Sequence, residues 1–350
     1  MITISYSPSD VLFTYQLPTS ISIALDLDQV TVSVACQGVT VFSTVLYAFK
    51  NKATLYDIRS IVEQYLIEKK RSYARVTIMA NGEKESATSV NIKTVIYSHV
   101  TLNSTAQAFC PTHFLSTAVA EALPKDCRQT MYYMAAATGT ITTFYDCLVR
   151  PTDGTAPRVY RISEKSKSIT QGTAYTISIY ASSMIATTKG YGTLLAFTAH
   201  YGLAAKTFYL TDRQPDLTLQ VYNEFNVLEY VYLNAVTKHV TEFDRDFALT
   251  QGQNTFYDDT TYTENETETA FLTFAEATRL ARLLLAPVLY IYEDGIRLEI
   301  IITDLTSEIS DAHNATNSIK FKWKYRTPQL RHHLKSELNT FDDTYSREYD

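Results

Sequence analysis

A short segment near the C-terminus alternates cationic and apolar side chains. The segment SIKFKWKYR (318–326) carries its apolar residues at every second position, with three lysines and an arginine between them. This pattern predicts a β-strand with one apolar face and a row of cations on the other. Such a row can bind phosphates, pair with carboxylates on a neighbouring strand, or protect a sheet edge from unwanted pairing. Because the net charge of the chain is −6 and no comparable cluster of cations exists elsewhere, nucleic acid is not an expected partner.

Motifs of known catalytic chemistry are missing from the sequence. There is no nucleotide-binding glycine loop, no HExxH zinc motif, no GxSxG elbow and no EF-hand loop. The seven histidines are scattered along the chain, and His332 and His333 are adjacent in a polar segment. We therefore predict no catalytic residue, no cofactor and no metal, and no enzymatic activity. An enzyme with an unrecognised site stays open as an alternative, and it would show a deep pocket that collects histidines and carboxylates.

The cysteines and the acidic residues are also interpreted as structural residues and not as functional sites. Four cysteines without CxxC spacing predict mostly buried thiols. An acidic stretch comprises Asp258, Asp259, Glu264, Glu266 and Glu268. This stretch lacks the glycine and the spacing of a calcium-binding loop, so a solvent-exposed acidic face is favoured. No apolar run reaches the roughly 18 residues of a membrane span, and the first residues lack the pattern of a secretory signal, so synthesis in the cytoplasm is expected.

The composition favours β-structure. The 350 residues include 26 tyrosines and 16 phenylalanines, with charged residues at only 19%. Aromatic and β-branched residues suit half-buried sheet surfaces, and a chain of this length usually forms more than one core. We predict a mainly β fold, with β-sandwich-like sheet domains, a few packed α-helices and several domains.

Patterns along the chain suggest where these domains lie. The predicted parts are a β-sheet domain with one helix at about 54–70 (1–110), a mixed connector (111–156), a second β-rich domain (157–240), a C-terminal α+β segment (241–330) and a polar tail (331–350). The boundary near 156 rests on the breaker segment PTDGTAP.

Local signals predict individual helices and turns. Thr273 and Glu276 form a capping box ahead of a helix at 273–286, which Pro287 would end. A short helix is also expected at 113–123. Gln37-Gly38 and Asp294-Gly295 are hairpin turn signals.

Several segments, in order, resemble tail- and baseplate-associated structural proteins of tailed phages and prophages of gut anaerobes. The segments are TVLYAFKNKATLYDIRSIVEQYL, VYNEFNVLEYVYLNAVTKHV with Asn223, Phe225 and Glu229, FDRDFALTQGQNTFYDD, and the stretch from FLTFAEATRLARLLLAP to SIKFKWKYR. Together they cover about two thirds of the chain. The resemblance carries over no catalytic residue.

What the resemblance implies is a virion structural protein, a tail or baseplate subunit made in the host cytoplasm. Its expected partners are copies of itself in a ring-like homo-oligomer and other tail or virion proteins, with no membrane. The aromatic residues expected at interfaces are Phe256, Tyr257, Trp323, Tyr325, Phe341, Tyr345 and Tyr349. The alternative function is a carbohydrate-binding or adhesin-like β protein, which would show a shallow, exposed aromatic cleft.

Overall fold

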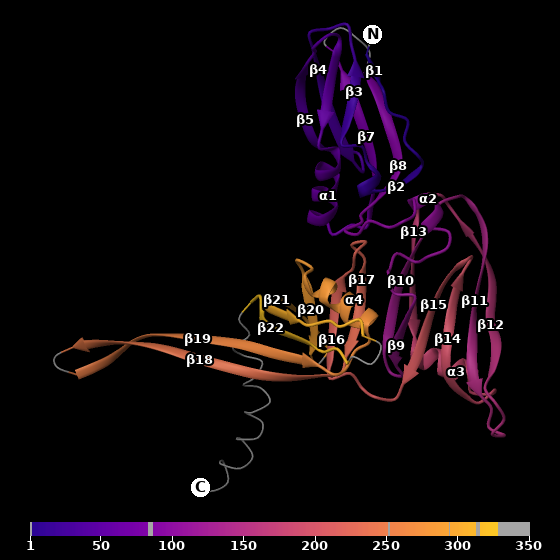
Figure 1. Ribbon diagram of the computed structural model, residues 1–350, viewed down its shortest axis with the longest axis vertical. Helices are drawn as coiled ribbons and strands as arrows, with labels where there is room; N and C mark the ends of the chain where they lie inside the picture. Colours follow the sequence, from indigo (N-terminus) through magenta and orange to yellow (C-terminus); the bar gives the residue numbers. More distant parts are fainter. Residues whose placement is uncertain (1, 83–86, 251–252, 294, 313–315, 328–350) are drawn as a thin grey trace, which may run out of the picture. The chain divides into compact units, whose positions relative to one another are not determined.

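The computed structural model divides the chain into two compact units, which are described separately. It describes residues 2–82, 87–250, 253–293, 295–312 and 316–327, without the side chains of Lys93 and of residues 241–263. The first unit comprises Met1–Gln214 with Tyr222–Tyr230, and the second comprises Pro215–Val221 with Val231–Asp350. Strands dominate both units (Figure 1).

The first unit begins with a sandwich of two sheets around one apolar core. A three-stranded sheet has the order β1-β3-β6 and a five-stranded sheet the order β2-β8-β7-β4-β5. Alternate residues of β3 and β4 point inward, and Ile23, Val32 and Val34 are fully buried in the shared core. The strands are β1 (Thr3–Ile4), β2 (Val11–Phe13), β3 (Ser20–Ala24), β4 (Gln29–Cys36), β5 (Val39–Tyr47), β6 (Lys52–Tyr56), β7 (Tyr73–Asn81) and β8 (Thr88–Ile96), with a 3₁₀ turn at Thr14–Gln16.

The single helix expected in this part is present but shorter than predicted. Helix α1 spans Ile58–Glu68, and the preceding residues form strand β6 instead. Asp57 lies at the N-cap with a left-handed backbone and makes no capping hydrogen bond through its side chain. The predicted turn at Gln37-Gly38 is confirmed, because both residues have positive φ, as a type I′ hairpin turn requires.

A second set of sheets follows in the same unit. A five-stranded sheet has the order β12-β11-β14-β15-β9, and β10 pairs with β13 in a two-stranded sheet. The elements are α2 (Ala106–Phe109), β9 (Ala120–Pro124), β10 (Arg128–Met134), β11 (Gly139–Arg150), β12 (Arg158–Ile169), β13 (Ala174–Tyr180), α3 (Ala181–Thr188), β14 (Thr193–Tyr201) and β15 (Ala204–Thr211).

Two predictions fail in this region. The breaker segment 151–157 is the loop of the β11–β12 hairpin, whose strands pair from Gly139↔Ile169 to Val149↔Arg158, so no domain boundary lies there. Proline and glycine suit a hairpin loop as well as a linker. The helix expected at 113–123 is also absent, because its last residues form β9, which runs parallel to β15. Helix α3 was not predicted.

The segment around Asn223 and Phe225, between β16 (Leu217–Tyr222) and β17 (Leu228–Leu233), is a buried loop of the first unit, called here the locked loop. The Asn223 side-chain amide donates to the Leu115 carbonyl oxygen at 2.8 Å, and its side-chain oxygen accepts from the backbone N–H groups of Phe225 and Val227. Phe225 is fully buried, with its ring centroid 5.8 Å from that of Phe13. These residues therefore fix the loop to the core.

The second unit is built on a seven-stranded sheet and one helix. The strand order is β17-β16-β20-β21-β22-β19-β18. Its elements are β16 (Leu217–Tyr222), β17 (Leu228–Leu233), β18 (Ala235–Thr250), β19 (Gln253–Thr269), α4 (Phe274–Leu284), β20 (Leu289–Glu293), β21 (Ile296–Ser307) and β22 (Ile319–Tyr325). The predicted hairpin is confirmed, since β20 and β21 pair up to Glu293↔Ile296.

Helix α4 begins as the sequence predicts. The Thr273 hydroxyl accepts from the Glu276 backbone N–H at 3.3 Å, and the Glu276 carboxylate accepts from the Thr273 backbone N–H at 2.9 Å. This reciprocal pair satisfies two amide donors that a helix end otherwise leaves open. The helix buries Leu280 and Leu284 against the sheet, whereas Leu285 is 71% exposed.

The protein is thus mainly β, with β-sandwich-like sheets, a few packed helices and more than one domain. Three cysteines are buried as predicted, and burial raises the thiol pKa of Cys36 to about 11, of Cys110 to about 12 and of Cys147 to about 11.

Candidate functional site

Three cations in the row on β22 and just after it form ion pairs with carboxylates of the neighbouring strands. The Lys320 ammonium lies 3.2 Å from the Glu268 carboxylate on β19, and Arg326 pairs with Glu299 on β21. Lys322 lies 3.7 Å from a third carboxylate, that of Glu264 on β19. The structure therefore supports carboxylate pairing for this row. It also corrects the edge-strand interpretation, because β22 has a hydrogen-bonded strand on both sides.

The aromatic residues of β22 belong mainly to the core. Trp323 is 1% exposed, and its indole N–H donates to the Thr267 hydroxyl at 2.9 Å. A side chain buried this deeply is not available to a partner, so the prediction that Trp323 lies at an interface is wrong. Tyr325 is partly buried, and its hydroxyl donates to the Glu293 carboxylate at 2.6 Å. Burial and this carboxylate raise the pKa of Tyr325.

The other residues predicted at interfaces have side chains outside the part of the chain that the structure describes. Phe256 and Tyr257 are on strand β19, but their side chains fall outside the described residues, as do Phe341, Tyr345 and Tyr349 altogether. Their predicted role at interfaces therefore stays a prediction.

Strands β18 and β19 form a hairpin that continues beyond the rest of their sheet (Figure 1). They pair from Ala235↔Thr269 to Thr250↔Gln253, whereas β22 pairs only with Asn265–Glu268 of β19. In the described chain, β18 is the last strand of its sheet. Residues 241–250 and their partners on β19 thus form a two-stranded segment, called here the ribbon. At the usual rise per residue it is about 30 Å long.

A second surface was not anticipated from the sequence. Strand β5 is the last strand of its sheet and pairs with β4 alone among the described strands. On and just after it, Val45, Tyr47 and Phe49 are 46%, 76% and 75% exposed. Exposed apolar side chains that are neighbours in the chain are typical of contact surfaces.

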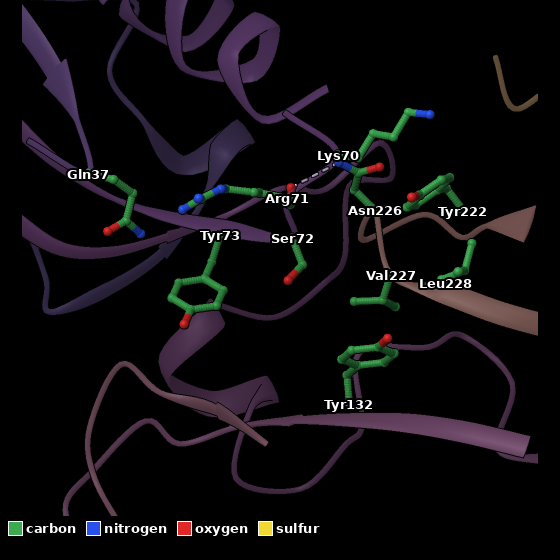
Figure 2. A pocket seen from close by; sticks show the side chains of 10 residues that line it. All are labelled: Gln37, Lys70, Arg71, Ser72, Tyr73, Tyr132, Tyr222, Asn226, Val227 and Leu228. Carbon is green, nitrogen blue, oxygen red and sulfur yellow. Dashed lines mark hydrogen bonds between the residues drawn. The ribbon is translucent and has the colours of Figure 1, made fainter. Parts of the chain in front are cut away.

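A polar pocket lies in the first unit, beside the end of helix α1 (Figure 2). Its volume is about 370 Å³. The lining residues come from the β4–β5 turn, the run from the end of α1 into the start of β7, strand β10, and the stretch from the last residue of β16 to the first of β17: Gln37, Lys70, Arg71, Ser72, Tyr73, Tyr132, Tyr222, Asn226, Val227 and Leu228. No sequence pattern predicted this pocket, because four separate segments contribute to it.

The walls of the pocket are held by hydrogen bonds from the Asn226 side chain and from the backbone. The Asn226 side-chain amide donates to the carbonyl oxygens of Leu66 and Arg71, at 3.0 and 2.9 Å. The Arg71 backbone N–H in turn donates to the Leu66 carbonyl oxygen, which closes the last turn of α1. Lys70 and Asn226 both have positive φ. The loop and the helix end are therefore fixed to each other.

Two clusters of ionisable residues bring a histidine or a lysine close to carboxylates. His200 lies 3.3 Å from Asp146, which also pairs with Arg161 at 3.0 Å, and the His200 ring stacks on Phe144. These residues lie on neighbouring strands of one sheet, and none of them lines the pocket of Figure 2.

The second cluster surrounds Lys206, which is 1% exposed. Its ammonium lies 3.2 Å from Glu121 and 4.0 Å from Glu229, and the Gln129 side chain donates to Glu121 at 2.7 Å. Buried charges are tolerated in proteins when they are paired in this way. The cluster is a structural ion pair of the core, and the residues that line the pocket of Figure 2 include no histidine and no carboxylate.

No protein-family model matches the chain, and no curated protein matches it. Among solved structures it is similar to E. coli alpha-2-macroglobulin, at 10% identity and a TM-score of 0.21, over 77% of this chain and 21% of that one. It is also similar to the fibronectin(III)-like modules of Clostridium thermocellum CbhA, at 11% identity and a TM-score of 0.17, over 61% of this chain and 95% of that one. This chain thus spans about a fifth of the alpha-2-macroglobulin, and likeness at these TM-scores has no bearing on function.

Across the described residues, no helix is long and apolar enough to cross a membrane, and no group of three or more potential metal ligands occurs.

Proposed function

We propose that this protein is a virion structural subunit, part of the tail or baseplate of a tailed phage or prophage, and that it acts by symmetric assembly. The sequence resemblance described above suggests the class of particle. The ribbon of β18 and β19 is the observation that supports an assembly role.

The ribbon is difficult to explain in an isolated subunit. A two-stranded hairpin is at best marginally stable in water, because it has no third strand and no second layer. Ten residues of β18 (241–250) pair with β19 and with no other described strand. Long exposed edges of this kind invite pairing with other chains. A partner that covers the ribbon would stabilise it and would occupy both of its edges.

The proposed partners are neighbouring copies of this protein and other tail or virion proteins. In a ring, one surface of a subunit contacts a different surface of the next. The ribbon would be the projecting surface of such a contact. The exposed apolar residues around β5 would be the surface on the next subunit that the ribbon contacts. The polar segment 331–350 would be a further arm that contacts a partner.

The proposal is tested by light scattering coupled to size-exclusion chromatography of the full chain, over about a hundredfold range of concentration. A closed oligomer of defined mass, such as a trimer or hexamer, supports self-assembly. A monomer at every concentration contradicts the homo-oligomer, and assembly would then require a different virion protein.

A further inference from the structure

The pocket at the end of helix α1 has an unusual charge for this protein. The chain carries a net charge of −6, yet the ten lining residues include two cations and no carboxylate. Within the described residues, no acidic side chain pairs with the Arg71 guanidinium, so its fork of donors is open to a ligand. In Figure 2 the side chains of Arg71 and Lys70 point in opposite directions, which leaves Arg71 as the cation on the side of Gln37 and Tyr73.

The remaining polar groups of the pocket are neutral and numerous. Four hydroxyl groups, from one serine and three tyrosines, line it together with the side-chain amide of Gln37. Tyrosine offers both an apolar ring face and a hydroxyl, a combination that suits ligands with one apolar and one polar side. Neutral donors and acceptors at several points around a cavity fit a ligand with several hydroxyl groups.

The backbone of the pocket is ordered before any ligand arrives. Asn226 uses its side-chain amide to hold Leu66 and Arg71, and Asn223 holds the loop that carries Val227. A site whose walls are already fixed loses less entropy on binding. Cations at a helix end also interact favourably with the helix dipole, which is a sufficient structural role for Lys70. That role does not account for Gln37 and Tyr73, which lie on the side of the Arg71 guanidinium (Figure 2).

From this arrangement we propose that the pocket binds an acidic sugar, a monosaccharide unit that carries a carboxylate. Arg71 pairs with the carboxylate, because the guanidinium fork matches the two oxygens of that group. The tyrosine hydroxyls and Gln37 bind the sugar hydroxyls. A volume of about 370 Å³ is at the small end of ligand pockets, which fits one sugar unit of a longer chain. This inference does not depend on the assembly proposal.

The test is ligand-observed saturation-transfer NMR on the full chain, with glucuronic acid, glucose, acetate and inorganic phosphate as four separate probes. Arg71→Gln is the test variant. Lys69→Gln is the matched control, because Lys69 is an exposed cation at the same helix end that does not line the pocket. Circular dichroism checks that each variant folds.

We expect glucuronic acid to bind and glucose and acetate to bind more weakly. Arg71→Gln is expected to weaken glucuronic acid binding about tenfold, the usual effect of losing a hydrogen bond to a charged group, and Lys69→Gln to leave it unchanged. Equal binding of glucuronic acid and glucose, or no effect of Arg71→Gln, would overturn the role of Arg71. Phosphate binding as tight as that of glucuronic acid would show an anion site without sugar selectivity, and no binding of glucuronic acid at millimolar concentration would remove the site.

Discussion

The two ends of strand β19 lie in opposite environments. At Asn265–Glu268 the strand has β18 on one side and β22 on the other, and Asn265 and Thr267 are buried. At the other end the same strand has only β18 as a neighbour among the described strands. Burial and two-sided pairing stabilise the first end within one chain, whereas the second end has no such support. The comparison indicates which part of the sheet serves the fold and which part is available to a partner.

The largest effect on the covered end is expected from Trp323→Ala. Trp323 is 1% exposed and its indole N–H donates to the Thr267 hydroxyl, so its removal leaves a cavity and breaks this buried hydrogen bond. The free energy of unfolding should fall by about 3–5 kcal/mol, measured by urea denaturation. Tyr325→Phe, on the same strand, removes one hydroxyl and should cost far less. Equal losses for the two variants would mean that Trp323 does not anchor the core.

The next prediction concerns two lysine–glutamate ion pairs that have the same distance between ammonium and carboxylate. Lys206 and Glu121 are 3.2 Å apart, as are Lys320 and Glu268, but the Lys206 side chain is 1% exposed and that of Lys320 is 53% exposed. Lys206→Met leaves two carboxylates without their cation and should cost about 3–5 kcal/mol. Lys320→Met should change stability by about 1 kcal/mol or less. Thermal unfolding of both variants decides whether burial or distance controls the energy.

A smaller effect on stability is expected from truncation after Arg326. The removed residues follow β22, so the midpoint of unfolding should stay within experimental error while the oligomer seen by light scattering weakens or disappears. An unchanged oligomer would exclude the polar tail as an assembly arm.

Local signals in the sequence predicted the parts of the fold that depend on neighbouring residues. The turn at Gln37-Gly38 and the capping box of Thr273 and Glu276 formed as expected, because each depends on backbone geometry within four residues. The helix expected at 113–123 failed, since its last residues gain a parallel strand partner from far along the chain. Tertiary pairing outweighed local preference there.

The candidate sites depend still more on distant contacts. The pocket joins Gln37, Arg71, Tyr132 and Tyr222, which no spacing in the sequence relates. Lys206 gives no local sign that it is buried, because its partner Glu121 lies on another strand. The alternation of β22 predicted its buried face correctly, but not that both of its edges are covered.

The central claim is that the ribbon serves assembly and not the fold, and shortening the ribbon tests it most directly. Replacing residues 242–262 by Asn-Gly places a two-residue turn after the pair Thr241↔Thr263 and keeps the register of the strands below it. Light scattering and thermal unfolding are then measured for this variant and the full chain at equal concentrations. We predict an unchanged unfolding midpoint and loss of the oligomer. An oligomer of unchanged mass would contradict the assembly role of the ribbon, and a large drop in the midpoint would show that the ribbon supports the fold instead.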